Sequence, residues 1–207
     1  MHTIRSERRR TSAAIFLLVL FGASPALALE IDDLRITRDG RVYKVQITFD
    51  VAAPTNKVMA VLKDNRFPDR LNPKVTNREV ISQQGALTRV RTEVYSCVLF
   101  FCKEVVMTLD VSVVADTIQS DIVPDKSDFR YGHMRWVVTS NEANGSHIVF
   151  EAVIEPDFFI PPVIGGFFAR KKLRQETMVT VANLETESAL EVVPDTKTSV
   201  VESAAVL

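Results

Sequence analysis

The stretch that decides the fold is Arg41–Val51 (RVYKVQITFDV), which leads directly into Ala52-Ala53-Pro54. Its apolar residues alternate with polar ones: Tyr43, Val45, Ile47, Phe49 and Val51 against Lys44, Gln46, Thr48 and Asp50. A period of two with one apolar side predicts a strand in an antiparallel sheet that is covered on a single face. Pro54 favours a helix start, because proline fits the first helical turn, and Thr55–Lys63 is the predicted short helix.

Further strands flank this one. Asp39-Gly40 predicts a hairpin turn to an earlier strand, Asp33–Arg38. Turn signals separate six later candidate strands, Thr76–Ser82, Leu87–Ser96, Lys103–Val114, Thr117–Val123, Arg130–Ser140 and Ser146–Pro156. A long helix is expected from Pro161-Pro162 onward. Its stripe starts with small residues and runs through Gly166, Ala169, Leu173, Thr177, Thr180 or Val181, and Leu184. This order predicts an α+β domain with one helix across an antiparallel sheet.

Three places in the chain resemble the START-like, helix-grip superfamily, in its polyketide cyclase and coenzyme Q-binding branch. They are Asp50–Pro54 with Val58 and Leu62, then Phe67-Pro68 with Leu71–Pro73, and finally Gly132, Trp136 and Gly145 with the strand Phe150–Pro156. Leu71 stands where that family frequently has tryptophan. The resemblance covers about Val42 to Leu184 and implies a curved antiparallel sheet of about seven strands wrapped around a long C-terminal helix. It also implies a mainly apolar cavity between them, which members use for lipids, quinones, hormones or polyketides, or for cyclisation.

The two ends of the chain differ from this domain. Arg5 and Arg8–Arg10 precede a short apolar run, Ala13–Ala23, and the small-residue site Ala26-Leu27-Ala28 follows. That pattern predicts a signal peptide over residues 1–28, a ligand-binding domain over 29–187 and a polar, flexible tail over 188–207. Removal of residues 1–28 leaves 21 basic and 25 acidic residues, a formal charge of −4. The expected location is therefore the periplasm or the exterior, and this charge argues against a nucleic-acid partner.

Recognisable catalytic and metal motifs are missing from the sequence. His133 and His147 fall on the predicted outer face with no ligand spacing around them, so no metal is expected. The sequence contains no P-loop, nucleophile elbow or dinucleotide fingerprint, so no cofactor is expected either. Cys97 and Cys102 bracket a four-residue hairpin tip, and in an exported protein they are expected to form a disulfide.

Strand direction gathers apolar loop residues at one edge of the sheet. If the six later strands form a meander, alternate strands end together, and the predicted pocket mouth comprises Phe67, Leu71, Leu99, Phe100, Phe101, Phe129 and Phe158. The predicted ligand-binding residues are Val90, Met107, Met134, Trp136, Phe150, Phe159 and Phe167. Basic residues beside the mouth (Lys103, Arg170 and Lys171 among them) would suit a transient contact with a membrane surface. A mouth that simply folds inward to cap the core is the alternative.

These observations favour an exported carrier for a hydrophobic small molecule such as a lipid, quinone or isoprenoid. One alternative is an enzyme of the cyclase or hydrolase kind, for which the sequence offers Thr88, Thr92, Glu93 and Arg130 as buried polar groups. Catalysis is the less favoured reading. Another alternative is a protein-interaction module that uses the apolar edge.

Overall fold

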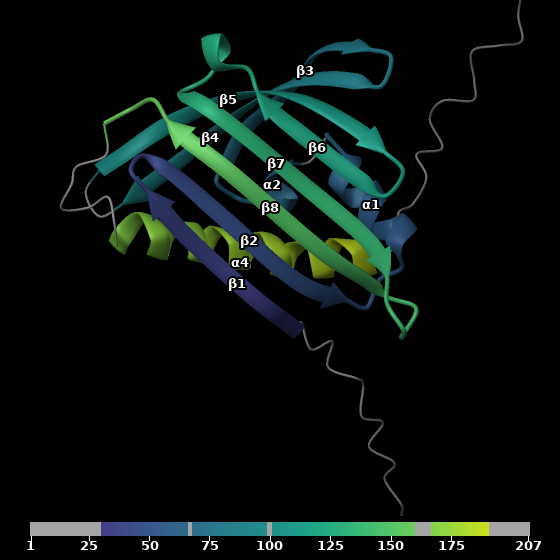
Figure 1. Cartoon of the computed structure of the whole chain (residues 1–207). Coiled ribbons are helices and arrows are strands. Elements are labelled where there is room, and N and C mark those ends of the chain that lie inside the picture. The colour runs from purple at the N-terminus through teal and green to yellow at the C-terminus, as the bar shows by residue number, and fades with distance from the viewer. Residues whose placement is uncertain (1–29, 66–67, 99–100, 160–166, 191–207) are drawn as a thin grey trace, which may run out of the picture.

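The computed structural model describes residues 30–65, 68–98, 101–159 and 167–190. Its strands are β1 (Glu30–Asp39), β2 (Val42–Val51), β3 (Val75–Gln84), β4 (Leu87–Val98), β5 (Phe101–Val114), β6 (Thr117–Ile122), β7 (Phe129–Ser140) and β8 (Ser146–Pro156). Its helices are α1 (Thr55–Lys63), α2 (Pro68–Leu71), the short η1 (Pro124–Lys126) and α4 (Phe167–Ala189). The helix-grip prediction is confirmed: α4 crosses one face of a curved sheet (Figure 1).

The eight described strands form one antiparallel sheet in the order β1-β2-β8-β7-β6-β5-β4-β3. Strands β3 to β8 are therefore a meander, as the sequence predicts, and the β1–β2 hairpin adds to β8. Gly40 closes that hairpin with φ of 57°, a left-handed conformation that glycine adopts without steric cost. Because the strands alternate in direction, β2, β5 and β7 end at one edge of the sheet, and β4, β6 and β8 end at the other.

The larger core lies where β2 ends and β8 begins. We call it the sealed cluster; it consists of Ile47, Phe49, Val51, Ala53, Val58, Met59, Ile118, Val138, Ile148, Val181 and Leu184, all of which are buried. Strands, α1 and the last turns of α4 all contribute to it. Ser146 also ties this end together, since its hydroxyl donates a hydrogen bond of 2.7 Å to the carbonyl of Ala53.

A smaller cluster lies at the opposite edge, near the start of β7. We call it the open cluster: buried Leu109, Ile122 and Phe129 pack with partly buried Val105, Met107, Val111, Met134, Ile154 and Phe158. Most of its members are therefore still reached by solvent, although the residues on the strands point to the face that α4 covers. The two clusters divide the inner face of the sheet into a closed half and an incompletely covered half.

The end of the folded domain differs slightly from the sequence expectation. Helix α4 continues to Ala189, and Ser188 is fully buried, so the domain extends past residue 187. The expected helix start at Pro161-Pro162, the signal peptide over 1–28 and the tail beyond 190 lie outside the described residues.

Candidate functional site

Helix α4 closes only one half of the inner face. Its buried residues are Val181, Leu184, Glu185 and Ser188, all in its last turns. The described residues from Phe167 to Thr180 are half-buried or exposed. This half of the helix carries the small and polar stripe that the sequence shows. The N-terminal half of α4 is therefore less completely buried than its last turns.

Apolar side chains of four strands lie on the inner face of the sheet, and two of them, Trp136 and Phe150, pack against the sealed cluster. Val90 on β4 is fully buried, while Met107, Met134, Trp136 and Phe150 on β5, β7 and β8 are only half-buried. Trp136 and Phe150 are direct partners across β7 and β8, and their ring centroids lie 4.2 Å apart. Methionine and aromatic side chains adapt to the shape of an apolar partner. The five predicted ligand-binding residues on the strands thus share one face.

The other two predicted ligand-binding residues lie at the edge of this surface. Phe159, which follows β8, and Phe167, the first residue of α4, are 69% and 66% exposed. The rings of Phe167 and Phe168 pack edge-on, with their centroids 5.4 Å apart. Two large aromatic side chains are therefore presented to solvent at the end of the sheet where the open cluster lies.

The predicted mouth is only partly brought together. Phe129 and Phe158 pack edge-on with centroids 6.0 Å apart, and the Lys103 ammonium lies 5.3 Å from the Phe158 ring centroid. A disulfide joins Cys97 to Cys102 across the β4–β5 hairpin. Phe67, Leu99 and Phe100 lie outside the described residues, and so does the side chain of Phe101.

Leu71 lies in a different environment from the other mouth residues. It packs against the sealed cluster, and its carbonyl accepts a hydrogen bond of 3.1 Å from Asn183 on the second half of α4. Arg70 reaches Glu187 on the same helix, with nitrogen and oxygen 3.6 Å apart. The segment that contains α2 is thus bonded to the last turns of α4, beside the sealed cluster.

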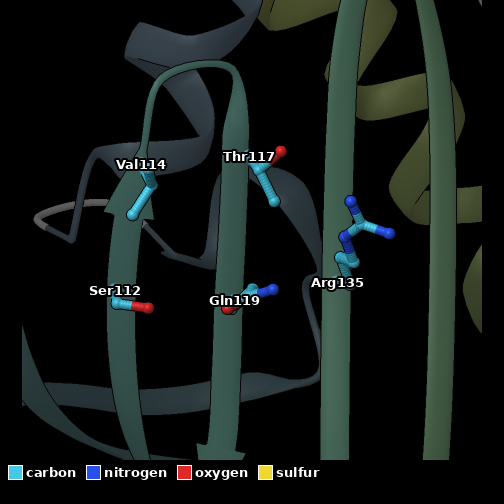
Figure 2. Close-up of a pocket in the computed structure, with 5 residues that line it drawn as sticks. All are labelled: Ser112, Val114, Thr117, Gln119 and Arg135. Carbon is cyan, nitrogen blue, oxygen red and sulfur yellow. The ribbon is translucent and has the colours of Figure 1, made fainter.

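Two hollows open on the outer face of the sheet, away from α4. The first, of about 270 Å³, is lined by Ser112, Val114, Thr117, Gln119 and Arg135 from β5, β6 and β7, as Figure 2 shows. The second, of about 430 Å³, follows the β7–β8 turn and is lined by Asp50, Thr139–Ala143 and His147. Both are lined mainly by polar or charged residues, which do not suit an apolar ligand.

Both described histidines form pairs with aspartates on that outer face, consistent with the alternation in the sequence. Nδ1 of His147 lies 2.6 Å from Asp50, and Nδ1 of His133 lies 2.7 Å from Asp121. The hydroxyl of Thr139 donates to the backbone carbonyl of His147. Among the described residues, no group of three histidine, cysteine or carboxylate side chains could hold a metal ion.

The polar residues that an enzyme would need are divided between the two faces. Glu93 pairs with Arg91 at 2.8 Å on the outer face, and Arg130 pairs with Asp157 at 2.5 Å while both remain exposed. Thr92 points inward, is 3% exposed, and its hydroxyl oxygen has no hydrogen-bond partner.

One inward polar residue, Arg78, has no clear signal in the sequence. Arg78 on β3 is the direct ladder partner of Thr92 on β4, so both side chains leave the sheet on the same face. Its Nε donates a hydrogen bond of 2.9 Å to Asn65 after α1. The alternation in β3 is weakly apolar and two bulges interrupt its pairing. Only the register with β4 therefore reveals that Arg78 faces inward.

Charges elsewhere on the sheet are compensated by neighbours. Arg89 contacts Asp110 through two nitrogens, at 2.6 and 2.7 Å; this hydrogen bonding lowers the pKa of Asp110 and raises that of Arg89. A hydrogen bond to Asp157 likewise raises the pKa of Arg130. Burial instead lowers the pKa of Arg78, since only desolvation acts on it.

Comparison with known proteins agrees with this architecture. A family model described as "Polyketide cyclase / dehydrase and lipid transport" matches residues 51–177, more than half of the chain. No curated protein sequence matches the chain. Within the described residues, no helix combines the length and the hydropathy needed to cross a membrane.

Three solved structures illustrate the shared fold. The Zhui aromatase/cyclase from Streptomyces sp. R1128 is 17% identical, with 72% of this chain and 94% of that chain covered and a TM-score of 0.57. The STAR-related lipid transfer protein from Xanthomonas axonopodis is 15% identical. The match covers 77% of this chain and 100% of that chain, with a TM-score of 0.57. Human StAR-related lipid transfer protein 5 is 16% identical. The match covers 75% of this chain and 86% of that chain, with a TM-score of 0.55. At these identities the likeness concerns the fold.

Proposed function

The chain belongs to the polyketide cyclase/dehydrase and lipid transport family, and from that premise we propose that it is an exported carrier of a hydrophobic small molecule. The ligand, a lipid, quinone or isoprenoid, lies between the inner face of the sheet and the N-terminal half of α4. Binding proceeds by burial of apolar surface and needs no covalent step.

The observation that carries this proposal is the incomplete closure of α4. Met107, Met134, Trp136 and Phe150 point to the helix side of the sheet, yet solvent still reaches each of them. Half-buried apolar side chains on an inward face lose part of the stabilisation that full burial gives, about 25 cal/mol per Å². An apolar ligand that covers them recovers that stabilisation, and this gain is the driving force for binding.

Export rests on separate features. The basic and then apolar start of the sequence, with its small-residue site at Ala26–Ala28, supports cleavage near residue 28. The disulfide between Cys97 and Cys102 is compatible with an oxidising compartment. Expression of the full gene in a Gram-negative host, followed by fractionation and intact mass, tests this part. We expect a periplasmic protein that begins near residue 29; a full-length chain in the cytosol would contradict export.

Exchange of the ligand takes place through a transient contact with a membrane surface. Phe159 and Phe167 are exposed beside the open cluster, and Arg170 and Lys171 follow on exposed positions of α4. Exposed aromatic side chains with adjacent basic residues suit the interface of an anionic bilayer. Sedimentation with phosphatidylglycerol vesicles should recover the wild type, and Phe159→Ser with Phe167→Ser should reduce recovery severalfold. Equal recovery of both would exclude this contact.

The binding proposal is tested by what the protein carries. Native mass spectrometry and solvent extraction of protein purified from its own host should reveal a mass increment that dissolves in organic solvent. Stripped protein should then bind a neutral probe such as N-phenyl-1-naphthylamine, with saturable fluorescence enhancement. An empty protein that is indifferent to this probe and to a panel of lipids would overturn the proposal.

A further inference from the structure

Arg78 carries a charge that no described carboxylate compensates. Its Nε is occupied by the neutral side chain of Asn65, and the two terminal nitrogens make no hydrogen bond or ion pair with any described residue. By contrast, Arg89, Arg91 and Arg130 are each paired with a carboxylate. An arginine does not lose its proton inside a protein, so a partly desolvated guanidinium without an anion is costly.

Thr92 adds an unsatisfied hydroxyl at the same place. The residue is 3% exposed, and its oxygen has no hydrogen-bond partner. A buried hydroxyl without a partner destabilises the protein, because it has lost its hydrogen bonds to water. Because Arg78 and Thr92 are opposite each other across β3 and β4, the two unsatisfied groups are neighbours on the inner face.

The surroundings of this pair are apolar and belong to the proposed binding face. Val90, two residues before Thr92, is fully buried, and Met107 is the ladder partner of Thr92 on β5. Thr92 and Met107 therefore join the polar pair directly to the half-buried apolar surface. A ligand that covers Met107 can place one end beside Arg78.

We propose that Arg78 and Thr92 bind the carboxylate of an amphiphilic ligand, so that the carried molecule is a long-chain carboxylic acid. The inference rests on the proposed carrier function and names its ligand class. The two terminal nitrogens of Arg78 form a planar fork that matches the two oxygens of a carboxylate, and the Thr92 hydroxyl supplies a third donor. One guanidinium neutralises one negative charge, so a monoanionic carboxylate fits better than a dianionic phosphate monoester.

The test compares three ligands that share one alkyl chain: palmitate, methyl palmitate and hexadecyl phosphate. Competition against N-phenyl-1-naphthylamine at pH 8 gives the three affinities. We expect palmitate to bind at least about tenfold more tightly than methyl palmitate, as charge-assisted hydrogen bonds in a desolvated site predict. Hexadecyl phosphate should fall between them. If the phosphate bound most tightly, the assignment of a carboxylate would be wrong.

Variants identify the residues that cause palmitate to bind more tightly than its methyl ester. Arg78→Gln should bring palmitate to the affinity of methyl palmitate and leave the affinity for the ester within about twofold. Thr92→Val should reduce the preference in part. Arg91→Gln is the matched control, since it removes the same charge from the outer face of β4, and it should keep the full preference. A preference that survives Arg78→Gln would overturn the inference.

The design separates the two proposals. If palmitate and its methyl ester bind the wild type equally well, the carrier function stands and the carboxylate site fails. If neither ligand nor the dye binds, the carrier function itself fails. Folding of Arg78→Gln is checked by thermal unfolding, where we expect no loss of stability, because the variant removes an uncompensated charge.

Discussion

The two halves of the inner face show how one sheet serves two purposes. In the sealed cluster, Phe49, Ile148 and Leu184 are fully buried, and the last turns of α4 pack directly on the strands. In the open cluster, Met107, Met134 and others stay half-buried, and the described members of that cluster include no residue of α4. The fold is therefore held mainly at one end of the helix. The other end contributes less to stability, and we propose that it accommodates the ligand.

Removal of a ring from the sealed cluster should have the largest effect on stability. Phe49→Ala deletes a fully buried ring, and such changes cost about 3–5 kcal/mol in the free energy of unfolding. Urea denaturation of the ligand-free protein measures this cost. The affinity for N-phenyl-1-naphthylamine, determined on the fraction that remains folded, should stay close to that of the wild type.

Phe150→Ala is the matched change at a ring of the proposed binding surface, on the border where that surface packs against the sealed cluster. Its ring is half-buried, so the loss of stability should be roughly 1–2 kcal/mol. The affinity for the dye should instead fall severalfold. If both variants lost the same stability, or if Phe49→Ala impaired binding more than Phe150→Ala, the distinction between the fully buried core and the half-buried binding surface would be incorrect.

Two glycines, one near each cluster, allow the stability of the two clusters to be compared through the steric cost of an added methyl group. A Cβ added at Gly145 would collide with the backbone carbonyl of Val51 at the sealed end, and the backbone there cannot easily move. A Cβ added at Gly132 would collide with the side chain of Ile122 in the open cluster, with Cγ1 at 2.7 Å. We expect Gly145→Ala to cost about 3 kcal/mol and Gly132→Ala about 1 kcal/mol. Thermal unfolding of both variants checks the order, and the reverse order would contradict it.

The disulfide at the open edge should matter less than the sealed cluster. Cys97 and Cys102 are separated by five positions, and the loop-entropy estimate for so short a ring is about 2 kcal/mol or less. The double variant Cys97→Ser, Cys102→Ser should therefore remain folded at room temperature. Its thermal midpoint should match that of the reduced wild type. Complete unfolding on reduction would show that the open edge holds the fold together.

The smallest effect is expected on the outer face, at Arg89 and Asp110. Hydrogen bonds from Arg89 lower the pKa of Asp110 in the folded protein, so the pair stabilises the fold above the unfolded carboxyl pKa of about 3.9. This contribution is lost as the pH falls through the lower, folded pKa. Asp110→Asn should lower stability slightly at pH 7 and leave it unchanged at strongly acidic pH. A deficit that persists in strong acid would exclude this explanation.

Much of the fold could be predicted from the sequence because alternation and turns are local signals. The helix Thr55–Lys63 and the strand Ser146–Pro156 have the predicted bounds, and the other strands differ by one to a few residues. The expected mouth residue Leu71 instead packs on α4, since that contact depends on how distant elements meet. Arg78 could not be placed because its direction follows from the β3–β4 register and its two bulges.

The most direct test of ligand binding on the inner face uses Trp136, the single tryptophan of the chain, which lies half-buried beside Phe150. Methyl 9,10-dibromostearate, a neutral ligand whose bromine atoms quench tryptophan on contact, is titrated into the stripped protein while Trp136 fluorescence is recorded. We expect saturable quenching that unbrominated methyl stearate reverses by competition. Binding of the brominated ester without quenching would place the ligand elsewhere, and the absence of any binding would contradict the carrier function.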